Sequence, residues 1–293
     1  MKTPLRLFSL FVMLGAFVGC SSDDDGGPVE FALTGISPQS GTVGTEVTLT
    51  GSEFPTDASE ISLTFEGTAA TITSVTSTRI VTTVPAGAAS GEVSVAANGF
   101  TKTAPVSFTV LEDLESGTVQ NLEAPQTGGQ GQPVGGPFTK FSFETGALTN
   151  SETDWDIAFR GTTIAVNGGT LTGTADEPAR NGNGGAAIET GIFAEVISAE
   201  GLTFAEDADG AFAIPAGSDS GWYNYNPATF TVTPIPGRVL VFRTHDGKYA
   251  KVEILSYYRD APAQPDPFMD ESRVYTFNYV YNPNDGDTSL AGQ

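Results

Sequence analysis

The chain contains a single cysteine, Cys20, and the residues before it predict the chemistry of its thiol. A basic start is followed by an apolar run from Leu7 to Val18, and the small residue Gly19 immediately precedes the cysteine. An apolar run of this length is too short for a stable transmembrane helix and is typical of a secretory signal peptide. We therefore predict that residues 1–19 are removed as a signal peptide and that Cys20 becomes the first residue.

The sequence around Cys20 resembles a bacterial lipobox, and the run Ser21–Asp25 after it resembles the export signal of surface lipoproteins of the Bacteroidetes. This resemblance implies a diacylglyceryl thioether together with an amide-linked acyl chain, and two acyl chains suffice for stable anchoring. We therefore expect a lipoprotein anchored to the outer membrane at the cell surface. The alternative is an ordinary secretory peptide with an incidental cysteine.

Charge and residue types exclude several function classes. The 293 residues include 13 basic and 35 acidic side chains, a net charge of −22, and loss of Lys2 and Arg6 with the signal peptide leaves −24. A field of that sign repels nucleic acid. One histidine, no second thiol and no Gly-x-Ser-x-Gly motif argue against a Ser-His or Cys-His hydrolase. We predict a protein that is not an enzyme and has no metal site, although two carboxylates of a glycosidase need only proximity in space and remain an open alternative.

The elements that position any site are predicted to be strands, so the expected fold class is all-β. Residues 31–110 contain short runs in which apolar and polar residues alternate, separated by glycine and proline, as in a small antiparallel sandwich. This region resembles the IPT/TIG immunoglobulin-like domains, and the residues that carry the resemblance are Ile36–Gly41, Gly44, Val47, Leu49, Gly51, Phe54, Val84–Gly87 and Gly91–Val93. The resemblance implies a spacer or adhesion module in which Phe54 closes one end of the core.

Composition divides the rest of the chain. We predict a flexible tether over residues 20–30 and a linker over residues 111–137, because the first is polar and charged and the second is rich in glycine and glutamine. From residue 138 to 293 longer, more aromatic strands predict a larger antiparallel sheet domain. Asp246-Gly247 between two alternating runs predicts a hairpin with a two-residue turn, and Arg273–Tyr281 predicts a final strand with four aromatic side chains on one face.

The segment 138–293 resembles the HmuY family of haem-binding surface lipoproteins. The residues that carry the resemblance are Phe141–Gly146, Asp154–Arg160, Gly161–Gly168, Asp246–Lys251, Tyr257-Tyr258 and Tyr275–Tyr279. The resemblance implies an all-β fold with a ligand pocket, and haem capture for a TonB-dependent transporter. Within Trp155–Arg160, Asp156 and Arg160 alternate on one strand face and are expected to form an ion pair or a buried polar network.

The chain departs from this family in its iron ligands. Haem iron needs an axial donor from His, Met, Cys or Tyr, and the region that supplies two His or Met in relatives, Thr170–Arg238, contains neither. Outside that region, His245 is expected at a solvent-facing hairpin tip and Met269 is expected to fill a gap in a proline-broken loop. Within it, Tyr223 and Tyr225 could donate a phenolate oxygen and Trp222 could stack on a macrocycle. The same three side chains could instead fill a core, or could stack on a sugar ring.

The sequence thus predicts a two-domain surface lipoprotein that binds haem or a related porphyrin through Trp222, Tyr223 or Tyr225. The alternative function is a carbohydrate-binding or structural lipoprotein that assists an outer-membrane uptake complex. The expected partners are the outer membrane, a TonB-dependent transporter, and a small-molecule or glycan ligand.

Overall fold

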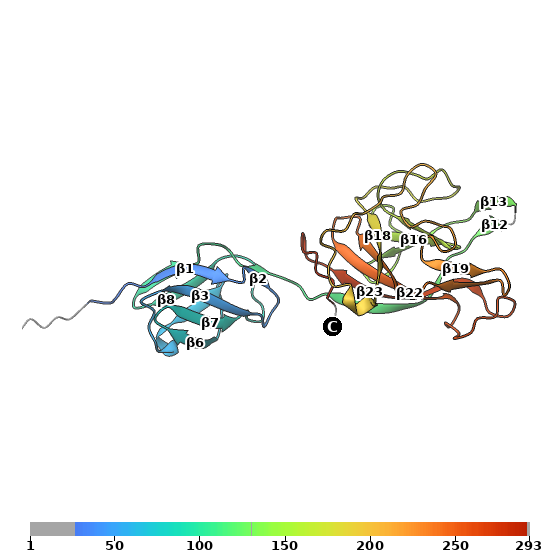
Figure 1. Ribbon diagram of the computed structural model, residues 1–293. Helices are drawn as coiled ribbons and strands as arrows, with labels where there is room; N and C mark the ends of the chain where they lie inside the picture. Colours follow the sequence, from blue (N-terminus) through green and yellow to red (C-terminus); the bar gives the residue numbers. More distant parts are fainter. Residues whose placement is uncertain (1–26, 130, 292–293) are drawn as a thin grey trace, which may run out of the picture. The chain divides into compact units, whose positions relative to one another are not determined.

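The computed structural model describes residues 27–129 and 131–291 (Figure 1). The chain divides into two compact units, residues 1–109 and 110–293. The predicted signal peptide, Cys20 and most of the predicted tether lie outside the described residues. Over the described ranges, no helix is both long and apolar enough to cross a membrane.

The predicted all-β class is confirmed, because the described elements are strands and two short 3-10 helices, η1 (Ala58–Glu60) and η2 (Phe193–Glu195). In the first unit, one sheet has the order β1-β3-β7-β6 and a second the order β5-β4-β8-β9. The strands are β1 (Ala32–Ser37), β3 (Glu46–Ser52), β4 (Ser62–Phe65), β5 (Thr68–Ala69), β6 (Ile72–Thr76), β7 (Arg79–Thr83), β8 (Val93–Ala97) and β9 (Phe100–Thr103). A short pair joins β2 (Ser40–Gly41) to β10 (Thr109–Val110).

The core of the first unit follows from the alternation in its sequence. Val47 and Leu49 are fully buried on β3 while their polar neighbours face outward, as a period of two requires. Gly51 allows β1 to approach β3, because a Cβ at this position would collide with the carbonyl oxygen of Ala32. Phe54 is buried and its ring lies 5.7 Å from that of Phe31.

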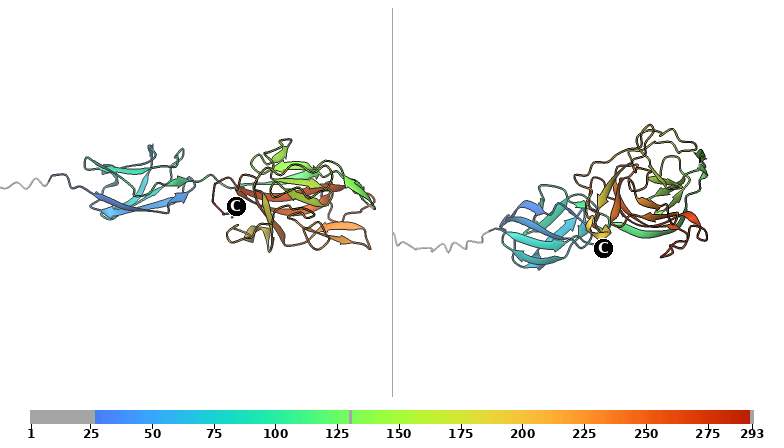
Figure 2. Two further views of the ribbon diagram at one scale, coloured as in Figure 1. Left: turned by 90° about the horizontal axis from the view of Figure 1, so that it is seen from above. Right: turned by 45° about the vertical axis from the view of Figure 1, so that its right-hand side comes forward.

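The second unit contains two larger sheets that face each other (Figure 2). The five-stranded sheet has the order β11-β23-β22-β21-β18, and the four-stranded sheet has the order β15-β14-β16-β17. Two hairpins, β12-β13 and β19-β20, complete the unit. The bounds are β11 (Glu115–Glu123), β12 (Thr127–Gly129), β13 (Gln132–Gly135), β14 (Thr139–Ser142), β15 (Ala147–Thr149), β16 (Ile157–Arg160), β17 (Thr163–Val166), β18 (Gly185–Thr190), β19 (Tyr223–Asn226), β20 (Thr231–Pro234), β21 (Arg238–Arg243), β22 (Tyr249–Tyr258) and β23 (Ser272–Asn282).

Aromatic side chains fill the space between these two sheets. The final strand carries the predicted wall, and all four of its aromatic residues, Tyr275, Phe277, Tyr279 and Tyr281, are buried in the core. The opposing sheet supplies Phe141 and Phe159, whose rings lie 5.5 Å from Phe277 and 4.8 Å from Tyr275 respectively. Pairs at these distances contribute beyond their buried area, so they fix how the two sheets pack.

The structure corrects the prediction of a linker over residues 111–137. Strand β11 forms the edge of the five-stranded sheet and pairs with β23, for example Gly117 with Tyr279. Only Leu122 of this strand is buried, so its sequence carries little of the apolar alternation that marks other strands. Its partner also lies about 160 residues further along the chain, beyond the reach of any local pattern.

The turn between β21 and β22 also differs from the prediction of a two-residue loop. Thr244 N–H donates to Lys248 O at 2.8 Å, and Gly247 N–H donates to Thr244 O at 3.1 Å. The loop therefore consists of three residues, His245 to Gly247, and its last residue has a left-handed φ of +96°. Such loops place glycine at this position because other L-residues are strained there.

Candidate functional site

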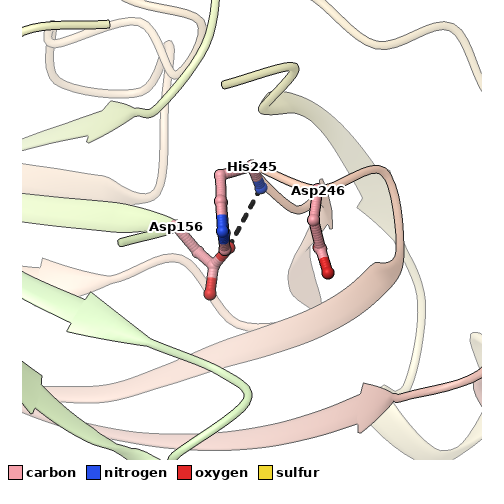
Figure 3. A group of neighbouring side chains, drawn as sticks. All are labelled: Asp156, His245 and Asp246. Atoms are coloured by element: carbon pink, nitrogen blue, oxygen red, sulfur yellow. Dashed lines mark hydrogen bonds and ion pairs between the residues drawn. The ribbon is translucent and has the colours of Figure 1, made fainter. Parts of the chain in front are cut away.

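The single histidine lies in this turn and contacts the opposite sheet (Figure 3). His245 Nδ1 lies 2.8 Å from Oδ1 of Asp156, and the backbone N–H of His245 donates to the same oxygen at 3.0 Å. Asp156 immediately precedes β16, and its other oxygen accepts the N–H of Phe143 at 2.7 Å. The histidine side chain is only 18% exposed, so the prediction of a solvent-facing tip is wrong.

The carboxylate of Asp156 determines what the imidazole can do. When Nδ1 donates to that carboxylate, the neutral ring presents the lone pair of Nε2. The hydrogen bond to Asp156 also raises the pKa of His245, although partial burial opposes this. The ring is thus held in one tautomer, with one nitrogen free to act as a single ligand or base.

The ligand atoms of Asp156, His245 and Asp246 lie within 4.8 Å of one another, which raises the question of a metal ion. Their oxygens are already engaged, however. Asp156 accepts the bonds described above, while Asp246 accepts from the Thr244 hydroxyl at 2.6 Å and pairs with Lys248 Nζ at 3.0 Å. Only Nε2 of His245 has no hydrogen-bond partner among the described residues, and one free ligand atom does not make a cation site.

The three predicted aromatic ligands divide between core and surface. Trp222 is buried and its Nε1–H donates to Thr162 O at 2.9 Å. Tyr223 is also buried and its hydroxyl donates to Ala216 O at 2.7 Å. Tyr225 is 40% exposed on the same strand, β19. The polar atoms of the first two residues therefore have partners inside the protein, and only the Tyr225 phenol faces solvent.

The hairpin that carries Tyr225 also supplies one residue of an exposed cluster. Phe230, at the end of the β19-β20 loop, is 56% exposed, and its ring lies 6.1 Å from that of Phe268 at 67°. Phe268 and its neighbour Met269 are 79% and 82% exposed, in the loop between β22 and β23. Met269 is therefore not the gap filler that the sequence predicted. We refer to Phe230, Phe268 and Met269 as the aromatic patch.

The backbone of Phe230 adds a second observation about this patch. Its φ is +60°, in the left-handed region that bulky residues rarely adopt. The hairpin is held against β22 by a hydrogen bond from Val232 N–H to the Tyr258 hydroxyl at 3.0 Å. Strain of this kind at an exposed phenylalanine makes Phe230 a candidate binding residue.

Met269 and His245 cannot both bind one iron atom. His245 precedes the first residue of β22, and Met269 lies in the loop that follows its last residue. A strand of ten residues spans roughly 30 Å at about 3.3 Å per residue. These two donors therefore lie beyond opposite ends of β22.

Arg160 and Asp156 do not form an ion pair with each other, and each lies instead in its own set of buried hydrogen bonds. Buried Arg160 donates from Nη1 to the carbonyl oxygens of Gly136 and Ala175, and lies 4.2 Å from the centre of the Phe138 ring. Burial lowers its pKa.

A buried ion pair that the sequence did not predict joins Arg180 to Asp207 at 2.8 Å. Burial raises the pKa of Asp207, against the effect of its hydrogen bonds. Asp207 also accepts N–H groups from Val166 and Ala213, so this pair stabilises the loops over β17 rather than forming an open site.

Comparison with protein families identifies both units. The IPT/TIG domain model matches residues 32–110, and the HmuY protein model matches residues 113–279, more than half of the chain. The chain belongs to the HmuY family. We refer to residues 110–293 as the HmuY unit. No curated protein matches the chain in sequence.

The chain is also similar, at low sequence identity, to several solved structures. A Tannerella forsythia apo HmuY analogue is 16% identical, with 59% of this chain and 99% of that chain covered and a TM-score of 0.37. An auxiliary nutrient binding protein from Bacteroides thetaiotaomicron is 15% identical, with 75% and 56% covered and a TM-score of 0.27. A structural genomics protein of unknown function from the same species is 14% identical, with a TM-score of 0.28, and the match covers 49% of this chain but only 36% of that one.

Proposed function

We propose that the HmuY unit binds haem or a related porphyrin at the cell surface and passes it to a TonB-dependent transporter, without catalysing a reaction. The observation that carries this proposal is the aromatic patch, in which exposed Met269 directly follows Phe268, whose ring lies 6.1 Å from that of Phe230. A thioether is an accepted axial ligand of haem iron, and apolar rings can contact the faces of a macrocycle. Membership of the HmuY family supports the ligand class.

We assign different roles to the aromatic residues around the patch. Tyr225, on the same hairpin as Phe230, offers a phenol oxygen as a second donor. Trp222 and Tyr223 are buried under the hairpin, with ring centres 5.1 Å apart, and position it against the core. A ligand on this patch would therefore contact Tyr225 rather than the other two.

Glycan binding is the second candidate, because exposed aromatic rings stack on sugars. The rings of Phe230 and Phe268 meet at 67° and therefore do not form one flat platform. This geometry favours a haem that is contacted at its edge and bound through its iron. It disfavours a sugar ring, which would stack on a flat aromatic surface.

The test is a haem titration of residues 21–293 followed at the Soret band. We expect saturable binding that Met269→Ala weakens by about tenfold, the free energy of one lost ligand contact. Tyr225→Phe, His245→Gln and Ile192→Ala are the comparison variants, and Ile192 is the control because it is 63% exposed on a different loop. If only Tyr225→Phe loses binding, the iron ligand is the Tyr225 phenol. If only His245→Gln loses binding, the site lies at the other end of β22. If the Soret band does not change on titration, the haem proposal is wrong, and a glycan array is the next test.

A further inference from the structure

The edge strand β18 leaves part of its backbone unpaired. It is hydrogen-bonded to β21 on one side only, with Ala187 opposite Val241. On the other side, Ala186 exchanges two hydrogen bonds with Ala205, at 2.8 and 2.9 Å. Every second residue of an antiparallel strand turns its N–H and C=O to the same side, so Ile188 and Thr190 face outward as Ala186 does. Neither has a backbone hydrogen bond on that side within the part of the chain that the structure describes.

A groove opens at this unpaired segment. It has a volume of about 390 Å³ and lies between the end of β18 and the loop that follows η2. Its lining residues are Glu189, Thr190, Gly191, Glu195, Val196, Ile197, Ser198 and Leu202. The groove thus brings together free main-chain groups, apolar side chains and carboxylates, all from the HmuY unit.

Exposed isoleucines lie at and beside this groove. Ile192 and Ile197 are 63% and 56% exposed, within six residues of each other along the chain. Natural proteins usually protect the edge of a sheet with lysine, proline or a bulge, because a free edge pairs with other chains. Over Ile188–Thr190 the edge carries no lysine, proline or bulge, and its one charged residue is Glu189.

We propose that the free edge of β18 accepts an extended segment of a partner protein as an added strand, and that this segment alternates apolar and basic residues. Main-chain hydrogen bonds to Ile188 and Thr190 supply affinity, as in other cases of strand addition. Glu189 and Glu195 line the groove and select for basic side chains in the added strand. Ile197 contacts the apolar residues between them.

Charge argues against a second copy of this chain as the occupant. The chain carries a net charge of −22, so two copies repel each other. Pairing of β18 with itself would also bring Glu189 of the two copies close together, and facing like charges destabilise a strand pair. The proposal concerns a surface distinct from the aromatic patch and does not depend on haem binding.

The decisive variant is Thr190→Pro, with Thr190→Ala as the matched control. Proline removes the outward N–H of Thr190, while the ladder bonds that Glu189 makes to Val239 remain, so the fold should tolerate it at this edge. The probe is a fluorescent eight-residue peptide that alternates lysine and valine, titrated with residues 21–293 and followed by anisotropy. An otherwise identical peptide of glutamate and valine tests the charge preference.

We expect the lysine peptide to bind, Thr190→Ala to bind it equally well, and Thr190→Pro to weaken it by about tenfold, as loss of a buried hydrogen bond predicts. The glutamate peptide should bind the wild-type protein far more weakly. If Thr190→Pro binds the lysine peptide as tightly as the wild-type protein does, the peptide is attracted by surface charge alone and the proposal is wrong. The proposal is also wrong if the wild-type protein does not bind the peptide at millimolar concentration.

A second variant tests the proposal independently if proline disturbs the fold. The double substitution Glu189→Lys and Glu195→Lys reverses the charge of the groove and leaves the backbone edge unchanged. We expect it to prefer the glutamate peptide over the lysine peptide. An unchanged preference would contradict the assignment of the groove as the binding surface.

Discussion

Asp156 is a buried acceptor that ties the β21-β22 turn to the start of β16. It is 2% exposed and accepts three N–H groups, two from His245 and one from Phe143. Asp156→Asn replaces one oxygen with an NH₂ group that must face one of these donors, so we predict a loss of about 3 kcal/mol in the free energy of unfolding. Urea denaturation of wild type and variant measures this difference in the free energy of unfolding. Glu152→Gln, in an exposed pair with Lys140, is the control and should change stability by less than about 1 kcal/mol.

The same contact predicts how stability depends on pH. The hydrogen bond to Asp156 raises the pKa of His245 above its unfolded value of about 6.5. Protonated His245 therefore stabilises the fold fully below about pH 6.5, and this contribution is lost as pH rises through the folded-state pKa. We predict that the difference in unfolding free energy between wild type and His245→Gln is larger near pH 5.5 than near pH 8.5. A difference that stays constant, or grows with pH, would contradict the raised pKa.

Single residues show why the sequence predicts a site only in part. The pattern around His245 correctly indicates a turn, but the carboxylate that orients its ring lies 89 residues earlier. Trp222 and Tyr223 are residue types that often line ligand sites. Their hydrogen-bond acceptors, however, are the backbone carbonyl oxygens of Thr162 and Ala216, which no sequence motif indicates. Exposure of Met269 follows from the shape of a loop, which residue types do not specify.

At the scale of elements, the β21-β22 hairpin depends on Gly247. Its φ of +96° is unfavourable for a residue with a Cβ, while a Cβ built there meets no atom within 4 Å. The cost of Gly247→Ala should therefore be backbone strain alone, about 1–2 kcal/mol of unfolding free energy. Gly247→Asn should cost less, because asparagine tolerates this conformation. Equal losses in the two variants would mean that the loop rearranges instead of straining.

Strands were predictable where one face is apolar and the other polar. Val47 with Leu49 on β3, and the four aromatic residues on β23, show that alternation in the structure as in the sequence. Strand β11 was not predictable, because an edge strand with Gly117 and polar neighbours buries little and depends on its partner β23. Local pattern therefore identifies strands with a buried face and misses those that exist only through pairing.

At the scale of the whole molecule, Cys20 is the residue predicted to anchor the protein to a membrane. We propose that lipid on Cys20 holds the protein on the outer membrane, because Cys20 follows an apolar run typical of a signal peptide and precedes the acidic run Ser21–Asp25. Cys20→Ala should move the protein from the membrane fraction to the soluble fraction, because the diacylglyceryl group, with its two acyl chains, is attached through the thiol. The check is an immunoblot of carbonate-washed membranes. Retention of the variant on those membranes would rule out the lipid anchor.

The two units are predicted to unfold independently, because each has its own sheets and core. Leu49→Ala removes a fully buried side chain from the first unit and should cost it about 3 kcal/mol. Calorimetry should then show one transition lowered by about 10–20 °C and the other unchanged. Phe277→Ala, in the core between the sheets of the HmuY unit, should lower only the other transition. A single transition that both variants lower would mean that the units stabilise each other, and the immunoglobulin-like unit would then be part of the folded binding protein rather than a spacer for it.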